Sequence, residues 1–151
     1  MRVSSDLEGM SSKLDWKEFE NFARLAFESA GFEVRQNFRL KKPTCEIDLV
    51  AFRGNSLAFA VDCKHWKRTV GYSTMLNIGS KQMERANRLT VSFKNVIPMV
   101  LTLHDEMLRV LENGVPVVPI STLSDFLLNW ENPENCVAVL KGTRVEKQLR
   151  L

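Results

Sequence analysis

Cysteine and histidine are scarce in this chain of 151 residues, which contains three cysteines and two histidines. The cysteines (Cys45, Cys63 and Cys136) are odd in number and include no closely spaced pair, which argues against a disulfide framework and against a zinc site. The pattern therefore indicates a reducing, intracellular environment. One of the two histidines, His104, ends a strongly apolar run, so the sequence does not support a histidine-based mechanism.

Long apolar runs and glycine-rich loops are also missing. No segment approaches the roughly 20 apolar residues of a membrane span, and the N-terminus lacks an apolar signal segment. We therefore expect a cytoplasmic location, which includes association with the nucleoid. No glycine-rich loop that could cradle phosphates is present, and this excludes an NTPase motor in this chain.

A strong excess of one charge is absent too. The formal net charge is +3 and the isoelectric point is near 8.9, a mild preference for polyanions. With 44% hydrophobic and 26% charged residues, the composition is that of a soluble globular protein. The length predicts one domain. We expect residues 1–13 to be a flexible, serine-rich lead-in and residues 14–151 to form that domain.

Polar residues end a short apolar run, Leu57–Lys64, in the first half of the chain. The run is rich in aliphatic and aromatic residues and follows the turn-forming residues 54–56, so it predicts a strand. Because side chains on a strand alternate between faces, Asp62 and Lys64 should point to one face and Cys63 to the other.

An earlier run, Glu46–Phe52, predicts a second strand that begins with acidic residues. On this strand Asp48 shares a face with Glu46, and the opposite face is expected to carry Ile47, Leu49 and Ala51. A turn at residues 53–56 would join the two strands as an antiparallel hairpin. The start of the first strand would then lie beside the end of the second.

This hairpin predicts a shared polar patch. Asp48 falls near Asp62 and Lys64, so two carboxylates and an ammonium group lie together. Carboxylate oxygens are hard ligands, and the patch therefore suits a divalent cation with an activated water. The alternative is a surface ion pair at the end of a strand.

The rest of the chain predicts further helices and strands. Asp15 is expected to cap the first helix, with Glu18 as its capping-box partner, and Gly31 to end it. Further strands are expected at 32–38, 96–103, 115–120 and 136–140, and further helices at 73–89, 105–112 and 123–130. Pro116 and Pro119 predict that strand 115–120 is an edge strand or ends quickly. Strands alternating with helices favour an α/β fold with a mixed sheet and helices on both faces.

The two motif strands resemble those of the PD-(D/E)xK nuclease superfamily, and among its members archaeal Holliday-junction resolvases and Mrr-type restriction endonucleases. The resemblance extends from Asp15 to about Arg88, and it departs from the pattern in one place, where Ile47 replaces the leading proline. It implies the restriction-endonuclease-like three-layer fold, a central mixed β-sheet flanked by helices. It also implies a DNA endonuclease that depends on Mg²⁺ or Mn²⁺.

The site residues follow from the residue chemistry and from this resemblance. Asp48 and Asp62 would hold the cation, and the resemblance adds the carbonyl oxygen of Cys63 as a further ligand. Lys64 would orient the attacking water and offset phosphate charge, or it would accept the proton of that water. Free Cys63 is otherwise expected to be an inert core thiol.

Helix residues supply further candidates. Glu20 stands at the offset from Gly31 at which the look-alike resolvases carry a helix glutamate, so the resemblance implies a third metal-binding, catalytic carboxylate there. Glu18 is the rival candidate, and a solvated helix side chain is the alternative. A glutamine after the site recurs in some superfamily members, which implies that Gln82 helps hold the scissile phosphate or water. The alternative for Gln82 and Lys81 is a solvated helix face.

Basic residues lie on both sides of the acidic strands and predict contacts with the DNA backbone, which position a protein without reading sequence. His65 could contact phosphate, and Trp66 could stack on a base or pack against a helix. Solvated loops are the alternative for the basic residues. The predicted nucleic-acid-binding set is Arg39, Lys41, Lys42, His65, Lys67, Arg68, Lys81, Gln82 and Arg85, with Arg88 as a further basic residue.

Three hypotheses of function follow. The first is a metal-dependent endonuclease, selective for DNA junctions or branches or of restriction type. The chain has no room for a separate recognition domain, so selectivity would come from DNA shape, from a homodimer or from a partner subunit. The second is a non-catalytic nucleic-acid-binding module of the same fold. The third is a structural protein that associates through the apolar segments 96–101 and 126–130.

Overall fold

The computed structural model describes residues 12–65, 70–103 and 107–142, with side chains from residue 16 onward. Its strands are β1 (Glu33–Leu40), β2 (Cys45–Arg53), β3 (Leu57–Lys64), β4 (Asn95–Thr102), β5 (Arg109–Val110), β6 (Pro116–Pro119) and β7 (Leu140–Lys141). Its α-helices are α2 (Ser12–Ser29), α3 (Tyr72–Arg88) and α4 (Leu123–Asn129), and its short 3₁₀ helices are η1 (Leu89–Val91), η2 (Ile120–Thr122) and η3 (Pro133–Asn135).

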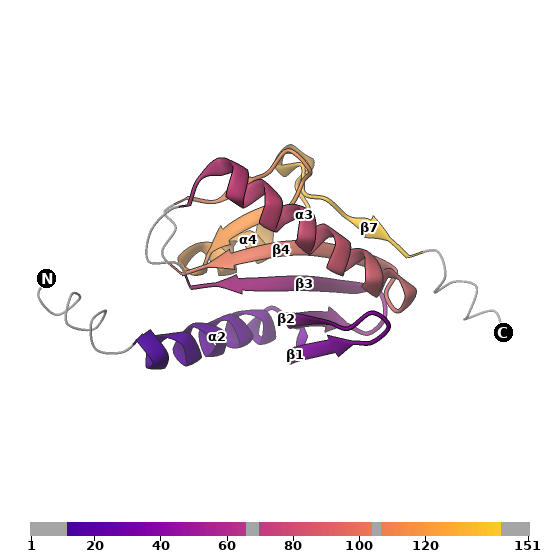
Figure 1. Cartoon of the computed structure of the whole chain (residues 1–151), viewed down its shortest axis with the longest axis horizontal. Helices are drawn as coiled ribbons and strands as arrows, with labels where there is room; N and C mark the ends of the chain where they lie inside the picture. The colour runs from indigo at the N-terminus through magenta and orange to yellow at the C-terminus, as the bar shows by residue number, and fades with distance from the viewer. Residues whose placement is uncertain (1–11, 66–69, 104–106, 143–151) are drawn as a thin grey trace, which may run out of the picture.

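One mixed sheet contains all the described strands. Their order is β1-β2-β3-β4-β6-β5, and β7 pairs with β4. The pairs β1–β2 and β2–β3 are antiparallel, whereas β3–β4 and β4–β6 are parallel. Helices cover both faces: α3 lies on one, and α2 and α4 on the other (Figure 1). This confirms the predicted three-layer α/β fold. In the part of the chain that the structure describes, no helix is long and apolar enough to cross a membrane.

Helix α2 owes its place on the sheet to an apolar stripe. Phe19, Ala23 and Phe27 recur every four residues and are buried against Phe59 and other side chains of β3. The chain leaves the helix at Gly31, whose φ of 93° is readily adopted only by glycine. The predicted cap was wrong, because the helix begins at Ser12 and Asp15 lies inside it.

The motif hairpin has the predicted register. Arg53 pairs with Leu57, and pairing continues to Leu49 and Val61. Gly54, with a φ of 54°, is in the turn. The crossover from β3 to its parallel neighbour β4 runs through α3, whose residues Met75, Gly79, Gln82 and Ala86 are buried. This connection places α3 directly over the central strands.

The predicted face of Ile47 was wrong. Leu49 and Ala51 pack on the α2 side of the sheet, but Ile47 packs with Val50 and Ala60 on the α3 side. Side chains of β2 therefore stop alternating regularly between Ile47 and Leu49. The neighbouring strand β1 is distorted at the same level: Asn37 has a φ of 52°, and the register of β1 with β2 skips Asn37 and Asp48.

The C-terminal half departs further from prediction. The helix expected at 105–112 is absent among its described residues, where Arg109–Val110 form β5 and a turn at Gly114 leads into β6. Leu111 and Val115 flank that turn and are buried beneath α3, which favours a hairpin over a helix. Strand β6 ends quickly, as its prolines predict, but it is not an edge because it lies between β4 and β5.

The strand expected at 136–140 and the association surface expected at 96–101 were also wrong. The last strand is limited to Leu140–Lys141, since Cys136 has a φ of 56° at the end of η3. Strand β4 pairs with β3, β6 and β7, and its residues 96–102 are buried, so segment 96–101 offers no surface to a second copy. His104 lies outside the described residues.

Candidate active site

The candidate site lies where strands β2 and β3 part. Their pairing ends at Leu49 and Val61, although both strands continue. Beyond that point β2 remains paired with β1, and β3 remains paired with β4. The sheet is therefore forked, and Asp48, Asp62 and Lys64 all lie in the fork.

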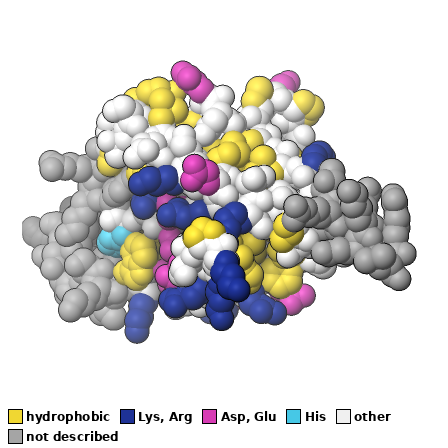
Figure 2. Space-filling model, turned by 45° about the vertical axis from the view of Figure 1, so that its right-hand side comes forward, with side chains coloured by type: hydrophobic (Ala, Val, Ile, Leu, Met, Phe, Trp, Pro, Cys, Tyr) yellow, Lys and Arg dark blue, Asp and Glu magenta, His cyan; other side chains and the backbone are white. Residues whose placement is uncertain are grey.

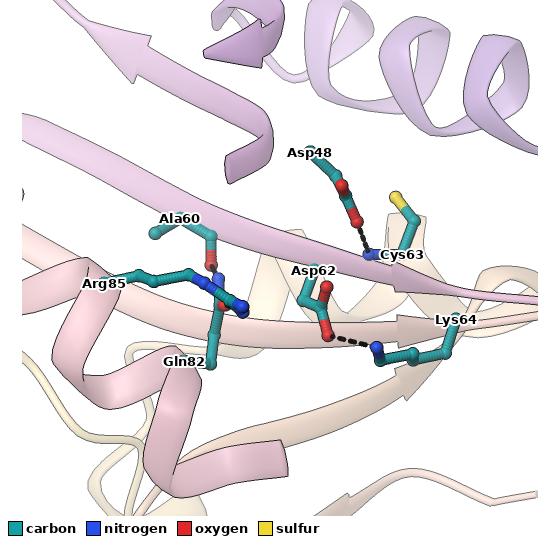
Figure 3. A network of polar contacts seen from close by, with 7 residues as sticks. All are labelled: Asp48, Ala60, Asp62, Cys63, Lys64, Gln82 and Arg85. Atoms are coloured by element: carbon teal, nitrogen blue, oxygen red, sulfur yellow. Dashed lines mark hydrogen bonds and ion pairs between the residues drawn. The ribbon is translucent and has the colours of Figure 1, made fainter. Parts of the chain in front are cut away.

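Asp48 is held in the fork by the opposite strand. Its Oδ2 accepts a hydrogen bond of 2.8 Å from the main-chain N–H of Cys63 (Figure 3). A side chain thus satisfies a backbone donor that regular pairing would have satisfied with a carbonyl. This contact fixes the first acid beside the acid-x-Lys segment, as the sequence predicts.

Asp62 and Lys64 point to the same face of β3 and form an ion pair with 3.3 Å between Oδ2 and Nζ (Figure 3). Asp62 is only 8% exposed. Within the described structure its Oδ2 has no hydrogen-bond partner, so the contact with Lys64 is electrostatic only. A buried carboxylate oxygen without a hydrogen bond is costly for the protein alone, and a bound cation would offset that cost.

Electrostatics in the fork disfavour three negative charges. Burial raises the pKa of Asp48 to about 6, helped by the adjacent Asp62 and opposed by the Cys63 N–H. Burial and the charge of Asp48 also raise the pKa of Glu20. Glu20 is half-buried on α2 and lies close enough to Asp48 for the charge of that carboxylate to act on it. Its role as a third metal-binding carboxylate stays a prediction. Glu18 is exposed on the same helix.

Gln82 is buried rather than solvated. Its Nε2 donates a hydrogen bond of 2.8 Å to the carbonyl oxygen of Ala60, and its Oε1 accepts one of 3.1 Å from Arg85 (Figure 3). The solvated alternative for Gln82 is thus wrong. The side chain instead ties α3 to β3 two residues before Asp62.

The cysteine and histidine beside Lys64 lie on the α2 side. Burial and the neighbouring carboxylates raise the pKa of the Cys63 thiol well above its usual range, which makes it unreactive. The ring of His65 packs edge-on against Trp16, with 5.5 Å between ring centroids, and near Phe19. Trp66, Lys67 and Arg68 lie outside the described residues.

The described basic candidates gather around the β1–β2 connection and α3. Lys41, Lys42 and Lys81 are exposed, and Arg39 pairs with Glu46 at 3.8 Å. Figure 2 shows Lys and Arg side chains grouped around acidic ones on one face of the molecule. In the sequence these cations both precede and follow the acidic strands, and the fold brings them together on one face of the molecule.

Thr102 was missed by sequence reasoning. It is the last residue of β4, pairs in register with Lys64 and is fully buried, and in the described structure its hydroxyl has no hydrogen-bond partner. Parallel strands that pair in register point their side chains to the same face, so Thr102 lies beside Lys64. The signal was available, because Thr102 ends an apolar strand as Asp62 does.

The donor set fits a hard divalent cation better than a zinc ion. Asp48, Asp62 and the Cys63 carbonyl offer oxygen atoms only. Among the described residues, no group of three or more His, Cys, Asp or Glu side chains is arranged to hold a metal. Two carboxylates are nevertheless sufficient for Mg²⁺, which commonly keeps several waters and takes substrate phosphate oxygens.

A forked mixed sheet between helical layers, with an acid and an acid-x-Lys segment in the fork, defines a restriction-endonuclease-like protein. A family model described as restriction endonuclease, for the Mrr catalytic domain, matches residues 11–92. The match covers more than half of the chain, and the chain belongs to this family.

Other comparisons add little. No curated protein matches this chain. A crystal structure of AF1548, a protein of unknown function, is similar at 15% identity and a TM-score of 0.44, covering 87% of this chain. The chain spans 65% of the length of that protein.

Proposed function

We propose that this chain hydrolyses DNA phosphodiester bonds as an endonuclease that depends on Mg²⁺ or Mn²⁺. One observation carries the proposal: Asp48, Asp62 and Lys64 meet in the fork of the sheet, where the strands that deliver them cease to pair. Membership of the restriction endonuclease family supports it. The buried Oδ2 of Asp62, which in the described structure has an ion pair with Lys64 but no hydrogen bond, supports a cation in particular.

Each side chain has a distinct role in this proposal. Asp48, Asp62 and Glu20, with the Cys63 carbonyl, would hold the cation. When bound, the cation would lower the pKa of the attacking water and offset phosphate charge. Lys64, fixed by Asp62, would bind a phosphate oxygen and orient that water. Burial of the fork strengthens these interactions because it excludes solvent.

We propose DNA as the substrate because exposed cations gather around the β1–β2 connection and α3, the elements that lead into the fork. Lys41, Lys42 and Lys81 would contact backbone phosphates, as would Arg39 in competition with Glu46. Such contacts do not read sequence, so selectivity would come from DNA shape. A homodimer would present two forks to the two strands of a duplex or junction, and the proposal includes it. A partner subunit is the other source of selectivity.

The test is cleavage of linear, nicked and four-way-junction DNA with Mg²⁺, Mn²⁺ or EDTA. We expect metal-dependent cleavage that Asp62→Ala and Lys64→Ala each reduce by about 100-fold or more. Lys94→Ala is the matched control, because it removes an exposed charge just before β4, whose first residue pairs with Leu57 at the end of β3 opposite to the fork. Binding of DNA without cleavage by any of these proteins would instead establish a non-catalytic module.

A further inference from the structure

A hollow of about 430 Å³ lies between the C-terminal half of α3 and the connection from β1 to β2. Residues 43–45 form one wall, and Lys81, Glu84, Arg85 and Arg88 form the other. Lys81, Arg85 and Arg88 recur at helical spacing, so one face of α3 presents three cations to the hollow. Glu84 is the single acid among its lining residues.

Arg88 builds the hollow rather than filling it. Its two terminal nitrogens donate hydrogen bonds to main-chain carbonyls of the opposite wall, at 2.7 Å to Pro43 and 3.0 Å to Lys41. These two bonds tie the β1–β2 connection to α3. The distance between the walls is therefore set by the protein and does not depend on a ligand.

Lys81 and Arg85 supply the charge that faces the hollow. Lys81 is exposed, and Arg85 is only partly exposed. Arg85 uses Nη1 to donate to Gln82, and a guanidinium has further N–H donors in a fixed fork that matches phosphate geometry. A built wall, an oriented guanidinium and a nearby ammonium group together form an anion-binding arrangement.

The hollow is linked to the catalytic strand. Arg85 donates to Gln82, and Gln82 donates to the carbonyl oxygen of Ala60, two residues before Asp62 on β3 (Figure 3). On the other wall, Cys45 begins β2, which reaches Asp48 three residues later. Both walls thus continue into the two strands of the fork.

We infer that this hollow binds a backbone phosphate of the DNA substrate, distinct from the phosphate that is cleaved. The inference rests on the proposed function and names a second contact point for the same strand. Lys81 and Arg85 are the binding residues, and Arg88 is a positioning residue. A DNA strand held at two phosphates would enter the fork in one orientation. The second contact would therefore align the substrate as well as attract it.

The first test measures DNA binding without cleavage, in EDTA, by fluorescence anisotropy at several salt concentrations. Lys81→Ala should weaken binding roughly 3- to 10-fold and lower the slope of log K against log salt by about 1, as loss of one phosphate contact does. Lys94→Ala removes the same charge just before β4, at the opposite end of the sheet, and should change neither. Equal effects of the two variants would overturn the inference.

A set of duplexes that each carry one neutral methylphosphonate locates the contact. One position away from the cleaved bond should weaken binding by wild type but not by Lys81→Ala. Inorganic phosphate at millimolar concentration should leave this pattern unchanged if the hollow is built for DNA. Full competition by free phosphate, with no sensitive position in the duplex, would assign the hollow to a small anion and overturn the inference.

Cysteine alkylation gives a readout that does not require activity. Cys45 lines the hollow and is half-buried, Cys136 is exposed elsewhere, and Cys63 is buried. Bound DNA should slow N-ethylmaleimide modification of Cys45 several-fold and leave Cys136 unaffected, as followed by mass spectrometry. Arg88→Ala should remove this protection because it releases the wall.

The outcomes separate the two proposals. Cleavage that persists with an unprotected Cys45 and an unaffected Lys81→Ala would refute the hollow and leave the endonuclease intact. Protection of Cys45 in a protein that never cleaves would refute the endonuclease and keep the hollow. Absence of DNA binding at low salt would refute both.

Discussion

The carboxylate of Asp48 takes the place of a backbone acceptor for Cys63, at 2.8 Å from its N–H. This bond forms where β2 and β3 have stopped pairing. The Asp48 carboxylate thus satisfies the Cys63 N–H that the separation of the strands leaves without a backbone acceptor. The bond also stabilises the charged form of a carboxyl that burial and Asp62 push toward protonation. The Cys63 N–H therefore keeps Asp48 positioned to bind a cation, and without a cation the buried charge lowers the stability of the folded protein.

Asp48→Asn should separate the charge from the hydrogen bond. The asparagine oxygen can still accept from Cys63, so we expect the fold to persist. Divalent-cation affinity, measured by calorimetry, should fall by about 10- to 100-fold or more, as it does when groups around a metal are removed. Cleavage should fall in parallel. Wild-type affinity in this variant would mean that Asp48 is not a ligand.

Asp48 should also make stability depend on pH. Its pKa is about 6 in the folded protein against an ordinary 3.8. The folded state therefore binds the proton more tightly, and the stability from this group, complete below pH 3.8, is lost as pH rises through 6. The full difference corresponds to about 3 kcal/mol, which partial exposure reduces to roughly 1–2 kcal/mol.

Thermal unfolding in EDTA from pH 4 to pH 8 measures this effect. The Tm of wild type minus that of Asp48→Asn should be about 2–6 °C lower at pH 8 than at pH 4, because only wild type loses the contribution of Asp48 as pH rises. Asp125→Asn, at an exposed site on α4, should run parallel to wild type. Saturating Mg²⁺ should raise the wild-type Tm at pH 8 more than at pH 4, since the cation competes with the proton.

Gln82→Ala should destabilise the protein by roughly 1–3 kcal/mol, because it deletes two hydrogen bonds and leaves a buried space. Urea unfolding monitors the loss. Gln36→Ala, on the exposed surface of β1, is the matched control and should stay within about 0.5 kcal/mol of wild type. A Gln82→Ala protein as stable as the control would show that the link from α3 to Ala60 is dispensable.

Gly114→Ala should destabilise the turn that replaces the helix expected at 105–112. Gly114 has a φ of 88°, and an added Cβ would lie 2.9 Å from the Cβ of Ala138 and 3.1 Å from its main-chain nitrogen. We expect a loss of about 1–3 kcal/mol in urea unfolding. Gly71→Ala is the control: a Cβ there meets nothing within 4 Å and its φ is −66°. Equal stability of both variants would contradict the turn geometry.

The first half of the site could be predicted from sequence because its information is local. A strand of alternating side chains fixes that Asp62 and Lys64 share a face, and a four-residue turn places Asp48 opposite them. The strand bounds 57–64 agree with β3, and the fold class agrees with the observed sheet. Short-range geometry and hydrophobic pattern sufficed for these features.

Tertiary contacts decided the remainder. The turn from Ile47 to the opposite face, the burial of Gln82 and the gathering of Lys81, Arg85 and Arg88 around residues 43–45 all depend on α3 crossing the sheet. The segment after β4 has helical composition, yet Leu111 and Val115 form a hairpin because that buries both under α3. Burial against distant residues outweighs local propensity, and a single sequence read along the chain does not contain those distances.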